Sequence, residues 1–297
     1  MLYQTKKIYI SDLPDAIRAT LPLWANYDIL IAFAKREKAT AYYIIVIEED
    51  NIIALMPVFE KKKIFLKYIY QPLDYKYTPI IFYKNSNQIN VLKSLATYLY
   101  KEYFRIMITL DPAINDIRAF KWSGLKAEPL YTYTKQIKDY SSDDLQKETK
   151  RILNNKAKKD LVMKKQWDLD IYKTLSIEML NRKKRSLRQI NDSYISFLNE
   201  IYAKGFITQY IAFKDENPLA YLIIIKDILQ KKIYAFFAAA DTNIKKNGAS
   251  LFCYDFILSN YTSGFDTFDF SGANIESIAY YKSQFNPELV NYYRIRK

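Results

Sequence analysis

The chain has 297 residues and half of them are apolar, which is enough to bury substantial cores in two domains of ordinary size. It contains no histidine and a single cysteine, so histidine-based triads, cysteine–histidine nucleophiles, histidine metal sites, cysteine-rich zinc sites and internal disulfides are excluded. No stretch has the roughly 18–20 apolar residues that a membrane-spanning helix needs, and residues 1–24 lack a signal-peptide core. We therefore expect a cytoplasmic protein without a membrane span.

The formal net charge of +13 is concentrated in one segment of the chain. Residues 147–188 carry 14 Lys/Arg against 5 Asp/Glu, whereas residues 189–297 balance at 11 against 11. Such a segment is either a solvated helix face or a site for a polyanion, such as a phosphorylated substrate, an RNA or a nucleotide-linked donor. The sequence leaves both interpretations open.

The first half of the chain is rich in predicted strands. A turn at residues 49–51 separates two apolar runs and indicates a hairpin. One segment, residues 90–104, has apolar residues at helical spacing. In chain order, the predicted strands are 42–48, 52–59, 63–70, 79–83, 106–110 and 130–137.

The polar residues 141–144 interrupt this pattern, and we place a domain boundary there, which gives domains at 1–140 and 141–297. A basic helix over 145–159 and a mostly helical region over 176–203 follow the break. The remaining predicted elements are strands 206–213, 219–226 and 232–240, helix 248–260, strand 265–270, helix 274–284 and strand 289–295. This order predicts an α/β (α+β) domain with a mixed sheet, and the first half is a weaker version of the same plan.

Three passages of the chain carry a resemblance to a known group of enzymes. The first is Tyr131–Tyr133, which leads into the basic helix; the second is Asn247–Ser250, after a long predicted strand. The third is the two-part ending formed by Phe268–Gly272 and Tyr280–Phe285. In this order and spacing they resemble the tandem GNAT-fold N-acyltransferases of the FemABX-like group, over roughly the last 170 residues.

The resemblance implies two tandem GNAT-like domains, with the degenerate one at 1–140 and the other at 141–297. It also implies transfer of an activated acyl or aminoacyl group to an amine, in a small molecule or in a cell-wall or nucleotide-linked precursor. No metal and no tightly bound cofactor is expected. Whether a tRNA is a partner stays open, and the sequence does not indicate an oligomeric state.

The donor is left open between acyl-CoA and aminoacyl-tRNA. GNAT enzymes hold the pyrophosphate of acetyl-CoA with a loop of the form Q/R-x-x-G-x-G/A. The matching positions are Lys245, Gly248 and Ser250, so two of the three residue types are replaced. FemABX-type enzymes take an aminoacyl-tRNA and lack an intact CoA loop.

The residues expected to bind the donor surround Gly248, where a predicted loop meets a predicted helix. A glycine there lets the backbone approach a ligand, and the N–H groups of the first helical turn hold phosphate oxygens. The alternative is an ordinary loop that has a glycine at the start of a helix. The predicted donor-binding residues are Lys245, Lys246, Asn247, Gly248, Ala249 and Ser250.

Three residues are predicted to carry the chemistry. Asp269 is either a general base, acting directly or through water, or a structural acid that accepts hydrogen bonds from the Ser271–Gly272 turn. Tyr280 lies five residues before Phe285, the spacing of the GNAT tyrosine that protonates a leaving thiolate, and its alternative is a packing aromatic. By the resemblance, Lys282 contacts a phosphate or a developing oxyanion, and otherwise it is a surface lysine.

The basic helix supplies the predicted substrate-binding residues Lys150, Arg151 and Lys156, which would face an anionic acceptor. Two readings from other classes stay open beside the transferase. In the first, the chain is a non-catalytic RNA- or polyanion-binding module, which its charge and aromatic content permit. In the second, it is a scaffolding protein on a GNAT fold.

Overall fold

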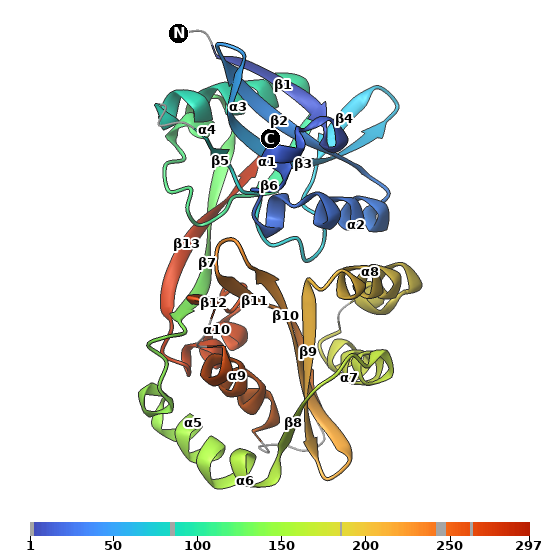
Figure 1. Cartoon of the computed structure of the whole chain (residues 1–297), viewed down its shortest axis with the longest axis vertical. Coiled ribbons are helices and arrows are strands. Elements are labelled where there is room, and N and C mark those ends of the chain that lie inside the picture. The colour runs from blue at the N-terminus through green and yellow to red at the C-terminus, as the bar shows by residue number, and fades with distance from the viewer. Residues whose placement is uncertain (1–2, 84–86, 185, 242–247, 262–263) are drawn as a thin grey trace. The chain divides into compact units, whose positions relative to one another are not determined.

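The computed structural model describes residues 3–83, 87–184, 186–241, 248–261 and 264–297. The chain forms two compact units (Figure 1). Met1–Tyr131 and Val290–Lys297 make the first unit, and Thr132–Leu289 make the second. The boundary predicted between residues 140 and 141 lies close to this division. The return of the last eight residues to the first unit was not anticipated from the sequence.

The first unit is built around an antiparallel meander with one parallel addition. The sheet order is β1-β2-β3-β4-β6-β13, and β5 pairs with β3. Of these pairs, only β4 with β6 is parallel. The elements are β1 Gln4–Tyr9, α1 Asp15–Arg18, α2 Tyr27–Glu37, β2 Thr40–Glu48, β3 Asn51–Lys63, β4 Leu66–Ile69, β5 Ile81–Phe82, α3 Gln88–Glu102, β6 Arg105–Thr109, α4 Arg118–Trp122, the start of β7 Lys126–Gln136, and most of β13 Glu288–Arg296.

Helices cover both faces of this sheet. On one face the buried residues of α3 and α4, among them Leu95 and Phe120, join a core with Ile44 and Met56 from the strands. On the other face α2 packs its apolar side, and the Phe33 ring lies 6.3 Å from that of Phe59. The alternation of side chains along β2 and β3 supplies both cores at once, which explains why these strands are apolar almost throughout.

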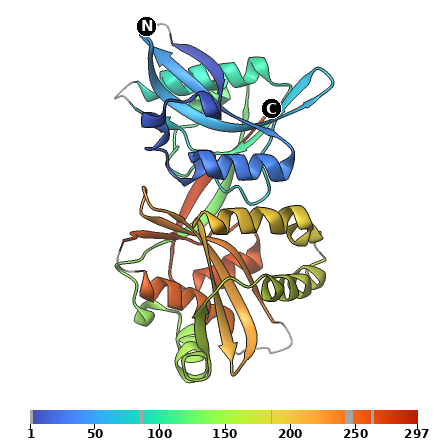
Figure 2. The ribbon, with the colours of Figure 1, turned by 45° about the vertical axis from the view of Figure 1, so that its right-hand side comes forward.

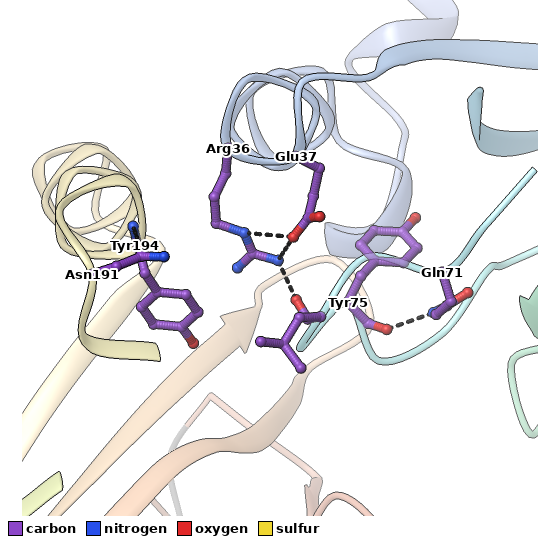
Figure 3. Close-up of polar contacts among 7 residues, drawn as sticks. Arg36, Glu37, Gln71, Tyr75, Asn191 and Tyr194 are labelled. Atoms are coloured by element: carbon purple, nitrogen blue, oxygen red, sulfur yellow. Dashed lines mark hydrogen bonds and ion pairs between the residues drawn. The ribbon is translucent and has the colours of Figure 1, made fainter. Parts of the chain in front are cut away.

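The loop after β4 is anchored to the first unit by polar contacts to backbone oxygens (Figure 3). Arg36 on α2 donates to the carboxylate of Glu37, at 2.8 Å, and to the carbonyl oxygen of Leu73. Gln71 donates to the carbonyl oxygen of Tyr75, whose own hydroxyl donates to the backbone of the segment before α2. The loop is therefore an ordered part of this unit.

The second unit repeats the plan of a mixed sheet covered by helices. Its sheet order is β7-β12-β11-β10-β9-β8, in which β11 and β12 are parallel and the other pairs are antiparallel. The predicted mixed sheet is confirmed. The elements are the end of β7, α5 Lys147–Ile152, a π-helical stretch Leu153–Ala157, α6 Lys158–Asp160, β8 Val162–Lys165, α7 Leu169–Arg182, α8 Asp192–Ala203, β9 Ile207–Lys214, β10 Asn217–Asp227, β11 Lys232–Ala240, α9 Ala249–Asn260, β12 Thr267–Asp269, α10 Glu276–Ser283 and the start of β13.

The sheet of the second unit is also covered on both sides, by α9 on one face and by α7 and α8 on the other (Figures 1 and 2). Ala220, Leu222 and Ile224 of β10 join the α9 core, whereas Tyr221, which lies between the first two, contacts α7 on the opposite face. On the α7 face the hydroxyls of Ser176 and Tyr221 lie 2.6 Å apart.

The helical region expected over 176–203 is two helices. Asn191 accepts a hydrogen bond from the backbone N–H of Tyr194 at 2.8 Å and so starts α8 afresh, as an N-cap asparagine does. Within the described ranges no helix is long and apolar enough to cross a bilayer.

Candidate active site

The site is built where two parallel strands of the second unit separate. β11 pairs with β12 over only three positions, of which Tyr234 with Asp269 is the last. β12 ends there, whereas β11 continues to Ala240. The register of β11 against β10 also shifts by one residue just beyond this point, which marks a β-bulge. Bulges and strand ends are places where a sheet re-aims side chains and offers backbone groups to a ligand.

Asp269, the last residue of β12, is fully buried and holds the turn that follows it. Its Oδ1 accepts a hydrogen bond from the Thr132 hydroxyl at 2.8 Å and from the Ser271 backbone N–H at 2.7 Å. Its Oδ2 lies 3.7 Å from the ammonium of Lys232, whose side chain is 17% exposed. A buried carboxylate needs such partners, because an unpaired charge is costly to desolvate.

Thr132 ties the same turn to β7. Its hydroxyl oxygen accepts from the backbone N–H of Gly272 at 3.0 Å while it donates to Asp269. The sequence suggested Asp269 but not Thr132, which lies 137 residues away and meets Asp269 only because β7 and β12 are neighbours. Asp269 therefore accepts a hydrogen bond from the Ser271–Gly272 turn, as expected of a structural acid, and its role as a general base stays a prediction.

Lys282 on α10 reaches the turn from the other side. It is buried, and its ammonium donates to the carbonyl oxygens of Ser271 at 3.0 Å and Gly272 at 2.8 Å. The structure therefore brings Asp269 and Lys282 to one turn, and the description of Lys282 as a surface lysine does not apply. Its contact with a phosphate or an oxyanion stays a prediction.

The Ser271–Gly272 turn itself is strained. Ser271 has φ 59° and Gly272 has φ 91°, and a serine in the left-handed region costs conformational energy that a glycine does not. The Ser271 hydroxyl oxygen is buried and makes no hydrogen bond to any described residue. Strain and an unsatisfied polar group at the end of a strand are features that folding alone does not favour.

The two adjacent tyrosines of α10 have different surroundings. Tyr280 is 68% exposed, so its side chain does not join Asp269 and Lys282 in a dry site. The hydroxyl of Tyr281 instead lies 2.7 Å from that of Ser250, in the first turn of α9. Burial raises the pKa of Tyr281 well above its usual value of 10. Tyr281 also packs against the core of the second unit.

Of the predicted donor-binding residues, Gly248, Ala249 and Ser250 are described, and Lys245, Lys246 and Asn247 lie outside the described residues. Gly248 has φ 76° and caps α9, a conformation that glycine adopts without strain. Ala249 is fully buried at the first helical position. The helix start lies where it was predicted, and its use for a donor stays a prediction.

Two of the predicted substrate-binding residues lie in α5 beside acidic partners. Lys150 pairs with Asp143, which lowers the pKa of that carboxyl, and Arg151 pairs with Glu148 at 2.7 Å. Lys156 lies in the π-helical stretch that follows. Local pairing makes the positive field of this segment weaker than its residue count suggests.

Two further side chains of the second unit, Asp255 and Cys253 on α9, are buried. The buried Asp255 on α9 accepts from the Tyr140 hydroxyl at 2.6 Å and pairs with Lys158 at 3.1 Å, which fixes α6 against α9. Burial raises the pKa of the Cys253 thiol to about 12, as expected of a structural cysteine. Among the described residues, no group of three or more Asp, Glu or Cys side chains is placed to hold a metal ion.

Comparison with known proteins defines the fold. The chain matches no protein-family model and no curated protein. Among solved structures it is similar to FemX, with a TM-score of 0.69 and 11% identity over 97% of this chain and 96% of that chain. It is also similar to the C-terminal domain of a putative lysylphosphatidylglycerol synthetase from Agrobacterium fabrum, with a TM-score of 0.62 and 9% identity over 97% and 91% of the two chains.

A tandem GNAT protein from the clavulanic acid biosynthesis pathway aligns with a TM-score of 0.59 and 8% identity, over 99% of this chain and 98% of that chain. At these identities the likeness shows the fold alone. The chain has the tandem GNAT fold of FemABX-like proteins, and this part of the sequence prediction is confirmed.

Proposed function

We propose that the chain is an acyl- or aminoacyltransferase that moves an activated acyl group onto an amine. The observation that carries the proposal is the Ser271–Gly272 turn. It lies at the end of β12, is held by a carboxylate and an ammonium, and contains a strained serine whose hydroxyl is buried without a partner in the described chain. The similarity to FemX and to a tandem GNAT protein supports the reaction class.

The reaction is a direct acyl transfer. The lone pair of the acceptor amine attacks the carbonyl carbon of the donor, a C–N bond forms, and the bond from that carbon to the sulfur or oxygen of the leaving group breaks. The amine loses one proton and the leaving group gains one. The site must therefore provide a proton acceptor, a proton donor and stabilisation of the transient oxyanion.

In this proposal Asp269 is the proton acceptor. Its carboxylate is fully buried and already accepts two hydrogen bonds, so the proton of the amine reaches it through a water molecule. The Ser271 hydroxyl binds the reacting amine or carbonyl, which would give that group the partner it lacks in the described chain. Lys282 keeps the turn in place and adds positive potential where negative charge develops.

The two tyrosines of α10 are the candidates for the group that donates a proton to the leaving group. Tyr280 is the residue that the sequence predicts, but an exposed phenol is a poor general acid because water competes for its proton. Tyr281 is half-buried, packs against the core of the second unit and lies against the first turn of α9. We therefore assign the donor role to Tyr281 and retain Tyr280 as the comparison.

The donor is expected to place a phosphate at the start of α9. Three N–H groups of a first helical turn and the helix dipole favour an anion there. Acyl-CoA and aminoacyl-tRNA both carry phosphates, so they share this chemistry and an experiment must separate them.

Ligand-induced stabilisation tests the proposal without knowledge of the acceptor. The full chain is heated with acetyl-CoA, with longer acyl-CoAs, with aminoacyl-tRNA and with uncharged tRNA. A donor at about 100 times its Kd raises the free energy of unfolding by about 2.7 kcal/mol. Stabilisation by one class of charged donor supports the proposal and identifies that class. No stabilisation by any of them, or equal stabilisation by uncharged tRNA and every other polyanion tried, contradicts it.

A further inference from the structure

The hairpin between β3 and β4 projects from the body of the first unit (Figures 1 and 2). The strands pair up to Lys63 opposite Leu66, so Ile64 and Phe65 alone form the turn. The hairpin is not part of the candidate active site, which lies in the second unit.

The tip of this hairpin is apolar and exposed. Ile64 is 82% exposed, Phe65 is 94% exposed, and Leu66 beside them is 41% exposed. Two other hairpins of the chain have the polar tips Glu49–Asp50 and Asp215–Glu216, which is the usual choice for a turn in water, whereas the turn after β10 also exposes the apolar Ile228 and Leu229. Phe65 and Ile64 gain nothing from folding, because folding leaves them in water.

The backbone conformation of the turn is also unfavourable for Ile64. Ile64 has φ 57°, a left-handed conformation that glycine, asparagine or aspartate adopts readily and a β-branched residue does not. A glycine at this position would form the same turn with less strain. Both tip residues are therefore unexplained by the fold, which indicates a role in contact with something else.

The charge around the tip has one sign. Residues 61–67 contain four lysines and no acidic residue. Two of these lysines have acidic partners. Lys62 lies 3.9 Å from the buried Glu60, which also pairs with Lys7 at 2.6 Å, and Lys67 pairs with Glu102 at 3.3 Å. Lys62 remains 62% exposed. The hairpin thus presents an apolar tip flanked by lysines on both strands, of which Lys62 and Lys63 are exposed.

We propose that this hairpin binds the surface of a membrane that contains anionic phospholipid. Ile64 and Phe65 enter the boundary between headgroups and acyl chains, and the lysines lie among the phosphates. An apolar tip with basic flanks matches a surface whose interior is apolar and whose rim is negative. A nucleic acid would match the lysines but leave the tip in water. This is attachment to one face of a bilayer and does not depend on the proposed transferase activity.

Flotation of the full chain with vesicles tests the proposal. Binding is expected to vesicles that contain phosphatidylglycerol, to be much weaker to vesicles of phosphatidylcholine alone, and to fall as salt is added. Replacing both tip residues (I64S/F65S) should reduce the partition coefficient at least about tenfold, given the apolar area withdrawn. Neutralising two lysines (K62Q/K63Q) should reduce it by about fivefold per lysine, which corresponds to about 1 kcal/mol each.

The chain offers matched controls for both variants. Ile228 and Leu229, in the turn after β10, are 76% and 60% exposed, so I228S/L229S removes similar apolar surface elsewhere. K121Q/K126Q removes two exposed lysines from the same unit. Both controls should bind vesicles as the parent does. The proposal is overturned by no binding to phosphatidylglycerol vesicles, by equal binding to neutral vesicles, or by hairpin variants that bind no worse than the controls.

The depth of the tip provides a second readout. In an F65C variant the new thiol is exposed, whereas Cys253 is 1% exposed and holds its proton, so an environment-sensitive thiol label attaches to position 65. The fluorescence of the label should shift to the blue with phosphatidylglycerol vesicles. Binding without that shift would show that lysines alone hold the protein, and would overturn the insertion of the tip.

Discussion

Substitution of Ser271 is the perturbation that separates function from folding most clearly. In S271A the backbone strain stays and the buried hydroxyl is removed. Burial of a hydroxyl without a hydrogen bond costs about 1–3 kcal/mol, so S271A should be as stable as the parent or more stable by about 1 kcal/mol. S271G also removes the strain of φ 59°, about 1–2 kcal/mol, but gives back about 0.5–1 kcal/mol in chain entropy. It should be the more stable of the two.

Both variants should nevertheless lose activity. A hydroxyl that binds the reacting group only in the transition state is expected to contribute roughly tenfold or more to turnover, which is about 1.4 kcal/mol. Urea unfolding measures the stability and a transfer assay with the donor found by thermal stabilisation measures the turnover. D215G, which relieves a left-handed aspartate in a surface turn, is the control and should change stability but not turnover.

Two results would refute this reasoning. If S271A is less stable than the parent by more than about 1 kcal/mol, the hydroxyl has a partner in the folded chain and its unsatisfied state is not a functional feature. If S271A and S271G are stable and fully active, the turn does not take part in the reaction.

Three further predictions concern other groups of the second unit. Y281F should lower turnover strongly and Y280F weakly, because Tyr281 lies half-buried against the start of α9 whereas Tyr280 is exposed, and the reverse order would return the acid role to Tyr280. D269N should cost roughly 3 kcal/mol in urea unfolding, since it breaks a buried pair with Lys232, and an unchanged stability would show that the pair is not formed. Because the pKa of the Cys253 thiol is raised in the folded chain, only the unfolded chain loses the thiol proton from about pH 9 upward. The free energy of unfolding should therefore fall towards pH 12 by up to about 1.4 kcal/mol per pH unit. C253A should show a shallower fall.

The strands and helices of the second unit could be predicted from the sequence because their signals are local. The apolar runs of β10 and β11 and the glycine before α9 each indicate an element without knowledge of the rest. Asp269 was recognisable for a similar reason, since an acid between Phe268 and Phe270 on a strand requires a partner.

The partners themselves could not be predicted. Thr132 and Lys232 meet Asp269 through strand order, which a single sequence does not specify. The choice between Tyr280 and Tyr281 depends on the phase of α10 against α9, and a spacing rule cannot fix that phase. The positive φ of Ser271 is likewise set by its neighbours, although a Ser-Gly pair after a strand is a turn signal.

The central claim is that the turn after β12 belongs to a site for acyl transfer to an amine. The most direct measurement is single-turnover transfer from the stabilising donor to a panel of small and nucleotide-linked amines, followed by mass spectrometry, for the parent chain and for S271A. The prediction is that the parent forms an amide whose mass equals the acceptor plus the acyl group less one hydrogen, and that S271A, equally folded, forms it at least roughly tenfold more slowly. Equal rates of amide formation by the two proteins, or none by either above the uncatalysed rate, would contradict the claim.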